Sequence, residues 1–160
     1  MEYHLRRKDK EITDQAELKR ILKTTTYVTI ALSKNDEPYL VSLSHGYDET
    51  HHCIYFHCAD TGKKIDYIKS NNRVWGQALK DHGYLQGECD HLFASVHFQG
   101  KVTFIESLKE KQAALECMIR QVDKNPEAII QRTKPERIKK VNLGRIDIEY
   151  MSGKKQTLKS

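Results

Sequence analysis

The sequence predicts a mainly β fold in which six antiparallel strands form a closed or nearly closed barrel with helices at its periphery. Six segments are rich in β-branched and aromatic residues, and polar turns or helical segments separate them. The regular alternation of strand and helix that a doubly wound parallel sheet requires is missing from the pattern, so antiparallel pairing is expected. The predicted strands are residues 25–33, 39–45, 53–58, 73–79, 92–105 and 143–150.

The first half of the chain predicts one helix followed by three strands in a meander. Thr13 or Asp14 can cap this helix, and Asp14 and Glu17 have the spacing of a capping box, which marks the start of a helix. The apolar face of this helix comprises Leu18, Ile21 and Leu22. The turns 34–38 and 48–51 are too short for a crossover helix, so they join the first three strands as antiparallel neighbours.

A second helix, an irregular segment and a long strand are expected next. The helix follows Thr61 and ends at residues 71–72. Residues 80–91 are polar, contain glycine and show no periodicity, which predicts a loop. In the strand that follows, Gly100 predicts a bulge or a sharp bend, because an isolated glycine weakens regular pairing.

The last third of the chain contains the clearest helical pattern. Ser107 is placed to cap this helix, and residues 125–126, an Asn-Pro pair, close it. A weakly helical region, 126–141, precedes the last strand, and a polar tail begins at about residue 152. The whole chain, 1–160, is expected to form a single domain, since 160 residues suffice for one core.

Composition indicates a cytoplasmic globular protein. Charged residues make up 31% of the chain and hydrophobic residues 38%. No apolar run approaches the ~20 residues that a membrane-spanning helix needs, and the charged beginning of the chain lacks the apolar core of a secretion signal. The four cysteines form no C-x-x-C pair, so reduced thiols are expected.

Positive charge is concentrated near the end of the sequence. The net charge is +5, and from Arg132 onward nine Lys or Arg stand against three Asp or Glu. Such a segment could attract a phosphate-bearing ligand or nucleic acid, although a solvated basic face is the more frequent explanation. Because Tyr150 is the only aromatic residue in this segment, stacking on single-stranded nucleic acid is not expected.

The helix start at residues 61–64, Thr-Gly-Lys-Lys, is a candidate phosphate site. A helix N-terminus offers unpaired N–H groups and a partial positive charge, and Lys63 and Lys64 would add full charges. The P-loop motif and the dinucleotide-binding G-x-G-x-x-G motif are both missing from the sequence. An ordinary solvated helix start is the alternative explanation.

Histidine and cysteine side chains give weaker signals when they are taken alone. His57 ends a predicted strand directly before this helix start, where a packed or hydrogen-bonded role is more common than a catalytic one. The histidines lack the H-E-x-x-H spacing of a zinc site, and four adjacent residues such as 88–91 seldom converge on one ion. No metal site is therefore predicted.

Several short motifs follow one another along the chain in an informative order. They are R6-R-K-D-K-E11, I30-A-L-S33, E37-P-Y-L-V-S-L-S-H-G-Y47, I54-Y-F-H-C-A59, G62-K-K-I-D66, N71-N-R-V74 and S95-V-H-F-Q-G-K-V102. In this order and spacing, from about Arg6 to Lys154, the chain resembles the nitroimidazole-resistance-type branch of the pyridoxamine-phosphate-oxidase-like flavoproteins.

The resemblance implies a six-stranded split β-barrel, a homodimer, and FMN in a cleft at the subunit interface. The flavin ring would lie along the second and third strands, the phosphate would lie near Lys63 and Lys64, and Ser95 would face the cofactor. His57 matches the histidine close to the flavin in resistance-type relatives and is the candidate catalytic residue. The implied cofactor-binding residues are Val41, Ser42, Leu43, Ser44, His57, Cys58, Ala59, Lys63, Lys64 and Ser95.

The chain also departs from its relatives on the substrate side. Met151 stands where several relatives have an aromatic residue, and Ala94 stands where they often have arginine. The Arg and His pattern with which pyridoxamine-phosphate oxidases bind their substrate is missing near the C-terminus. A pyridoxamine-phosphate substrate is therefore not expected.

The resemblance implies a flavin oxidoreductase that would pass two electrons from a donor such as NAD(P)H to a small molecule, with nitroaromatics as one candidate class. The flavin would carry the chemistry, and the protein would supply binding and orientation. Two alternatives stay open: a haem-binding barrel, considered because the chain has eight histidines, and a non-enzymatic flavin carrier or sensor. Membrane and nucleic-acid partners are not expected.

Overall fold

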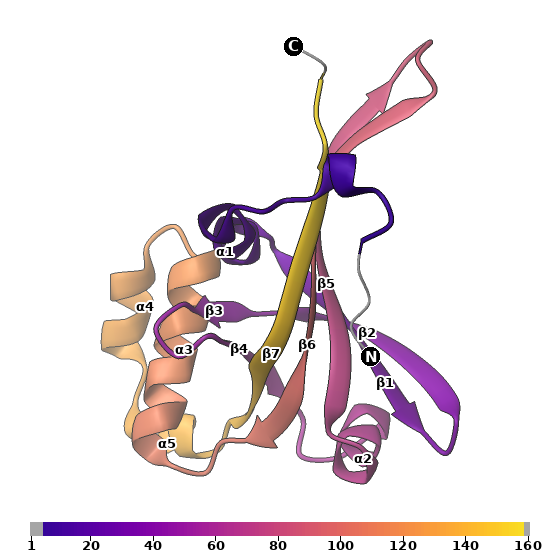
Figure 1. The fold of residues 1–160 in the computed structure, drawn as a ribbon. Helices are drawn as coiled ribbons and strands as arrows, with labels where there is room; N and C mark the ends of the chain where they lie inside the picture. The colour runs from indigo at the N-terminus through magenta and orange to yellow at the C-terminus, as the bar shows by residue number, and fades with distance from the viewer. Residues whose placement is uncertain (1–4, 159–160) are drawn as a thin grey trace.

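The computed structural model describes residues 5–158 and confirms a mainly β architecture with peripheral helices (Figure 1). Residues 1–4 and 159–160 of the predicted domain lie outside the described residues. The strands are β1 Tyr27–Lys34, β2 Glu37–Ser44, β3 Gly46–Asp48, β4 Cys53–Cys58, β5 Arg73–Leu85, β6 Asp90–Phe104 and β7 Asn142–Gln156. The helices are η1 Lys8–Lys10, α1 Gln15–Thr24, α2 Lys63–Ser70, α3 Leu108–Val122, α4 Pro126–Arg132 and α5 Pro135–Lys139.

The strands form one antiparallel sheet in the order β2-β1-β5-β6-β7-β4-β3. The register of β6 against β7 shifts between Gln99 and Gly100, which confirms the predicted bulge. At that point a Cβ on Gly100 would lie 2.2 Å from the carbonyl oxygen of Asp147, so a larger residue does not fit. Residues 5–158 form seven strands rather than the predicted six, because the three-residue β3 follows β2 after a single residue, His45.

The sheet stays open along one line, which makes the barrel a split one. The chain runs from Ser44 through His45 into β3, whose Gly46 pairs with Tyr55 of β4. β2 therefore ends beside β4 at this corner, and the two strands contact each other, yet they are not neighbours in the hydrogen-bonded order. We call the line between Val41–Ser44 of β2 and His57–Ala59 the seam.

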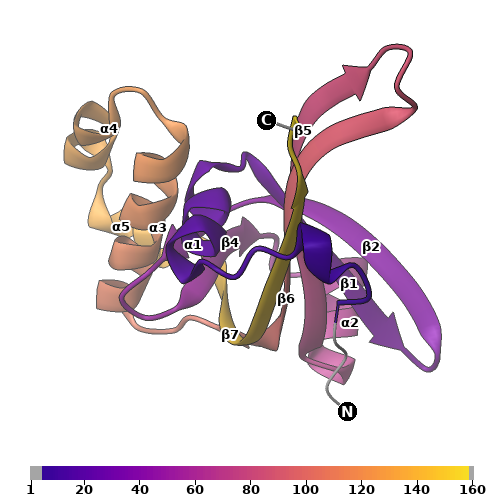
Figure 2. The same ribbon diagram turned by 45° about the horizontal axis from the view of Figure 1, so that its top comes forward.

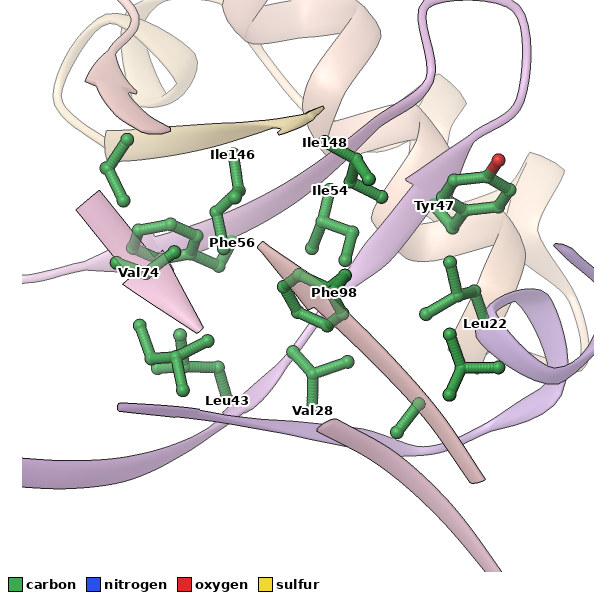
Figure 3. Packing of buried hydrophobic residues seen from close by; sticks show 14 of the residues in the cluster. Leu22, Val28, Leu43, Tyr47, Ile54, Phe56, Val74, Phe98, Ile146 and Ile148 are labelled. Atoms are coloured by element: carbon green, nitrogen blue, oxygen red, sulfur yellow. The ribbon is translucent and has the colours of Figure 1, made fainter. Parts of the chain in front are cut away.

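Two phenylalanine rings fill the centre of the barrel (Figure 3). Phe56 of β4 and Phe98 of β6 are fully buried, and each faces a glycine on a neighbouring strand. A Cβ on Gly144 would lie 2.2 Å from the Phe56 ring, and one on Gly76 would lie 2.1 Å from the Phe98 ring. The glycines thus leave room for rings whose full burial contributes on the order of 2–3 kcal/mol each.

The helices cover different parts of the sheet (Figure 1). Asp14 caps α1 by accepting a hydrogen bond from Ala16 N, and Leu18 packs so closely on β7 that a Cβ on Gly153 would lie 2.3 Å from it. Helix α3, capped by Ser107 as predicted, packs against β3 and β4. Helices α4 and α5 lie outside α3 (Figure 1).

Two predicted segments are wrong. Residues 80–91 are not a loop: β5 and β6 continue through them as a paired hairpin, which we call the arm (Figures 1 and 2). The predicted last strand, 143–150, ends too early, since β7 stays paired with β6 as far as Gln156 and so includes the first part of the polar tail. Strand prediction depends on an alternation of buried and exposed side chains. Both segments lack this alternation, and main-chain hydrogen bonds pair them as strands without it.

Candidate functional site

The two faces of β2 differ in what they offer a ligand. Ser42 and Ser44 point outward and are exposed, and Ser42 Oγ lies 2.8 Å from Thr29 Oγ1 on β1. Leu43 alternates into the core, and Val41 packs half-buried against it. Of the four residues predicted here, the serines can therefore present side chains to a cofactor, whereas Leu43 could do so only through its main chain.

The end of β4 forms the other side of the seam. His57 is exposed because its neighbour Phe56 takes the inward position. Cys58 is half-buried, and its Sγ lies 3.8 Å from the carbonyl oxygen of Asn142. Burial raises the pKa of the Cys58 thiol, against the opposing effect of the Lys64 charge, so the thiol stays protonated near neutral pH. The carbonyl oxygen of Ala59 accepts a hydrogen bond of 3.0 Å from Asn142 Nδ2.

Helix α2 begins with an uncapped N-terminus. Gly62 occupies the N-cap position with φ 122°, and no side chain caps the helix. A Cβ on Gly62 would have nothing within 4 Å, so the space beside Gly62 at the start of the helix is open. The donor set fits a phosphate, because the first turn of a helix provides unpaired N–H groups and positive potential.

Lys63 and Lys64 lie at the same helix start but turn toward different strands. Lys63 Nζ lies 3.6 Å from Glu37 Oε1 and 4.8 Å from the centre of the Tyr39 ring, both on β2. Lys64 Nζ lies 5.8 Å from the Phe56 ring of β4. The two ammonium groups therefore stand on either side of the seam.

Ser95 does not join this group within one chain. His57 pairs with Leu143 of β7, whereas Ser95 pairs with Lys154, eleven positions further along the same strand. At ~3.3 Å per residue the two pairs are roughly 35 Å apart along β7. The structure thus gathers the predicted residues of β2, β4 and α2 around the seam and leaves Ser95 at the far end of the sheet.

Ser95 lines a separate hollow of about 540 Å³, which we call the Ser95 cleft. Ser95 is 5% exposed, and its Oγ donates to the carbonyl oxygen of Lys154 at 3.4 Å. The cleft is also lined by Gln77, Leu79, Phe93, His97 and Lys154. Sequence analysis missed these five residues, although alternation along 93–97 would have placed Phe93, Ser95 and His97 on one face.

The strand register aligns side chains in rows across the outer face of the sheet. One row is polar: Ser42, Thr29, Gln77, His97 and Ser152. The next row is mostly apolar: Leu40, Ala31, Trp75, Gln99 and Tyr150. Leu40 is 66% exposed and Trp75 40%, which leaves large apolar side chains on an open face.

A larger hollow lies away from every predicted site residue. It measures about 640 Å³ and is bordered by the C-terminal end of α1, the β3–β4 turn and α3. An ion pair between Lys23 and Glu49 lies at its edge, and Cys117 lines it with a pKa raised to about 11 by burial. We give the smaller Ser95 cleft more weight, because it contains a predicted residue and several convergent polar groups.

Residues 5–158 contain neither a metal-ligand cluster nor a membrane-spanning helix. Within this range no three His, Cys, Asp or Glu side chains come together as metal ligands. His91, from the cluster 88–91, instead lies with its Nε2 2.7 Å from Asp81 Oδ1 on the opposite strand of the arm. No helix in the described part of the chain is long and apolar enough to cross a membrane.

Solved structures with the same fold include flavoproteins. A candidate 5-nitroimidazole antibiotic resistance protein from Bacteroides thetaiotaomicron has a TM-score of 0.78 at 24% identity, covering 90% of this chain and 85% of that chain. A flavocytochrome from Azotobacter vinelandii has a TM-score of 0.79 at 16% identity, covering 97% of this chain and 73% of that chain. An FAD-binding protein from Mesorhizobium loti has a TM-score of 0.65 at 22% identity, covering 90% of this chain and 96% of that chain.

At these identities the solved structures establish the likeness of fold. No curated protein matches the chain by sequence. The family model described as pyridoxamine 5'-phosphate oxidase matches residues 14–155, nearly the whole chain, and the observed split barrel agrees with it. The chain therefore belongs to the pyridoxamine 5'-phosphate oxidase family.

Proposed function

We propose that this chain binds FMN, with the phosphate at the start of α2 and the flavin ring along the seam. The observation that carries the proposal is the uncapped N-terminus of α2, where Gly62 leaves open space beside Lys63 and Lys64. A single phosphate matches this single cradle, which favours FMN over a dinucleotide flavin. The similarity to proteins described as FAD-binding or as a flavocytochrome supports a flavin in this fold.

The position of Ser95 favours a homodimer. One chain separates Ser95 from His57 by roughly 35 Å along β7, so both can contact one cofactor only if a second copy supplies one of them. The outer face offers a suitable surface, since Leu40, Trp75 and Leu79 expose 66%, 40% and 51% of their area there. A two-fold dimer would form two such clefts, each with residues from both copies.

The proposed activity is reduction of a small molecule, with nitroaromatics as the candidate class. A bound flavin supplies two-electron redox chemistry. Ser42 and Ser44 line the outer side of β2 with hydroxyl groups that can orient the polar edge of a ring. His57 is exposed at the seam, where its imidazole can donate a proton to a substrate or hold it in place. The free cysteines favour a reducing compartment such as the cytoplasm.

The visible spectrum of the freshly purified protein tests the cofactor. A two-band flavin spectrum with FMN released by acid is expected. FAD, or a sharp Soret band from haem, would contradict the FMN proposal. Haem is the second candidate, because the flavocytochrome shares this fold and two histidines, His91 and His97, line the Ser95 cleft.

The phosphate cradle is tested by substituting Lys63→Met and Lys64→Met together. Loss of two charges should weaken FMN binding roughly tenfold to a hundredfold, as expected for charge-assisted contacts, while the affinity for riboflavin stays within about twofold. Binding is measured by flavin fluorescence quenching. Lys69→Met, in the last turn of the same helix, is the matched control and should behave as wild type. Equal losses for FMN and riboflavin would place the phosphate elsewhere.

A further inference from the structure

Lys154 carries an uncompensated charge inside the Ser95 cleft. Its Nζ lies 5.7 Å from the centre of the Phe93 ring, and no carboxylate approaches it within 4.0 Å among the described residues. Its neighbour Lys155 behaves differently, since its Nζ lies 2.8 Å from Glu17 Oε2 on α1. The alternation of β7 therefore directs Lys155 to an acidic partner on α1 and Lys154 into the cleft, where no carboxylate of residues 5–158 lies within 4.0 Å of it.

The acidic residue at the margin of the cleft is already engaged. Asp81 Oδ1 lies 2.7 Å from His91 Nε2 and accepts a 2.8 Å hydrogen bond from Gly83 N. These two contacts lower the pKa of Asp81, so it is ionised but directed toward the arm. Glu11, whose main chain bridges to Lys154, also holds its carboxylate more than 4.0 Å from Lys154 Nζ, so no acidic group of residues 5–158 forms an ion pair with Lys154.

Neutral polar groups and apolar walls complete the cleft. Gln77 Nε2 lies 2.8 Å from His97 Nε2, and burial together with the charge of Lys154 lowers the pKa of His97, which keeps that imidazole neutral. Leu79 and Phe93 provide apolar surface on which a flat molecule can lie. A flat apolar body that ends in an anionic group matches this arrangement.

We propose that the Ser95 cleft binds the carboxylate-bearing aromatic substrate of this protein, with Lys154 as the counter-ion of the carboxylate and Phe93 as the wall on which the ring packs. The inference rests on the proposed function, because a second copy on the outer face would bring its flavin to this end of the sheet. It narrows the substrate class from small aromatics in general to aromatic acids.

The test compares 4-nitrobenzoate with 4-nitrobenzyl alcohol, which differ mainly in the carboxylate. Dissociation constants are measured by equilibrium dialysis on the protein as purified, with its own cofactor. The acid is expected to bind at least about tenfold more tightly than the alcohol, and Lys154→Met should abolish that preference, as loss of one charge-assisted contact implies. Lys101→Met, which removes a charge paired with Glu149 on another part of the sheet, should leave the preference intact.

Three results would overturn this inference: equal affinity of the wild type for the acid and the alcohol, an equal loss in both lysine variants, or loss of flavin but not of the acid in Lys154→Met. The last of these results would assign Lys154 to the cofactor.

Benzoate, which cannot be reduced, is dialysed against the same proteins. Preferential binding of benzoate by a protein that carries no flavin would support the cleft while the proposed cofactor failed, so the two failures are distinguishable.

Discussion

His45 is a buried histidine at the corner where β2 gives way to β3. It is 0% exposed, and its Nε2 lies 2.9 Å from the carbonyl oxygen of Leu22 and 2.9 Å from Gln121 Nε2. The other ring nitrogen, Nδ1, has no hydrogen-bond partner within residues 5–158. Burial lowers the pKa of His45 despite the hydrogen bond to Leu22, so the folded protein keeps this imidazole neutral.

The free energy of unfolding should therefore fall as the pH drops below about 6.5, the ordinary pKa of histidine. In that range the unfolded chain takes up a proton at His45 and the folded chain does not. His45→Phe removes this proton uptake, so the variant should lose less stability than wild type between pH 7 and 5. Thermal melts followed by circular dichroism measure the difference.

The control for this experiment is His82→Phe, at an exposed position on the arm. Its melting temperature should follow the wild-type pH profile. If His45→Phe also followed that profile, the acid sensitivity of the fold would have to come from other groups, such as His97, whose pKa burial lowers as well.

Among the elements, the arm depends least on the core. Its pairing runs from Asp81 and Phe93 outward to Leu85 and Asp90, with a register shift between Asp81 and Gly83. Tyr84 is 47% exposed, and the arm projects from the barrel (Figure 2). Few buried contacts hold the arm in place, so its contribution to the free energy of unfolding should be small.

Replacing residues 82–92 by Asn-Gly, a two-residue hairpin turn, tests this expectation. The melting temperature should change by less than about 3 °C, because a shift of that size corresponds to under ~1 kcal/mol in a domain of this length. Differential scanning calorimetry gives the value. A drop of 10 °C or more would show that the arm supports the core.

At the same scale, the sequence predicts elements well where burial alternates or follows a helical period. The α1 and α3 caps at Asp14 and Ser107 and the bulge at Gly100 are confirmed. The sequence does not predict that the arm and the end of β7 are strand. The arm is an exposed hairpin, and the end of β7 packs on the core through a glycine, Gly153, so neither segment shows an apolar pattern.

The candidate site shows a similar division. The resemblance in motif order groups residues of the second and third predicted strands with the start of α2. The structure places His57 and the outward serines of β2 on the two sides of the seam, with Lys63 beside Glu37 of β2. The separation of Ser95 from the residues at the seam is not predicted by the motif order. It depends on the length and register of β7, which pairing along the whole sheet determines and which no local stretch of sequence encodes.

At the scale of the whole molecule, the proposed dimer should depend on the outer face. Trp75→Arg places a charge in the apolar row, where Trp75 packs edge-on against Tyr150 with ring centres 6.0 Å apart. The variant should sediment as a monomer at concentrations where the wild type is a dimer, and it should retain less flavin, because each cleft needs both copies.

Trp75→Phe keeps an apolar ring and should preserve both properties. Analytical ultracentrifugation with detection at the flavin absorption follows mass and cofactor together. A monomeric Trp75→Arg variant that kept its full flavin content would contradict the shared cleft. A Trp75→Arg variant that stayed dimeric would place the interface on another surface.

The length of β7 has a consequence for mixed assemblies. In each copy, one end of β7 pairs with the strand that holds His57, and the other end pairs with the strand that holds Ser95. Each copy would therefore contribute its two ends to two different clefts. Two chains that are each inactivated at a different end would then complement each other. Their hybrid would hold one cleft with both lesions and one cleft with none, and half of its sites would work although neither parent has a working site.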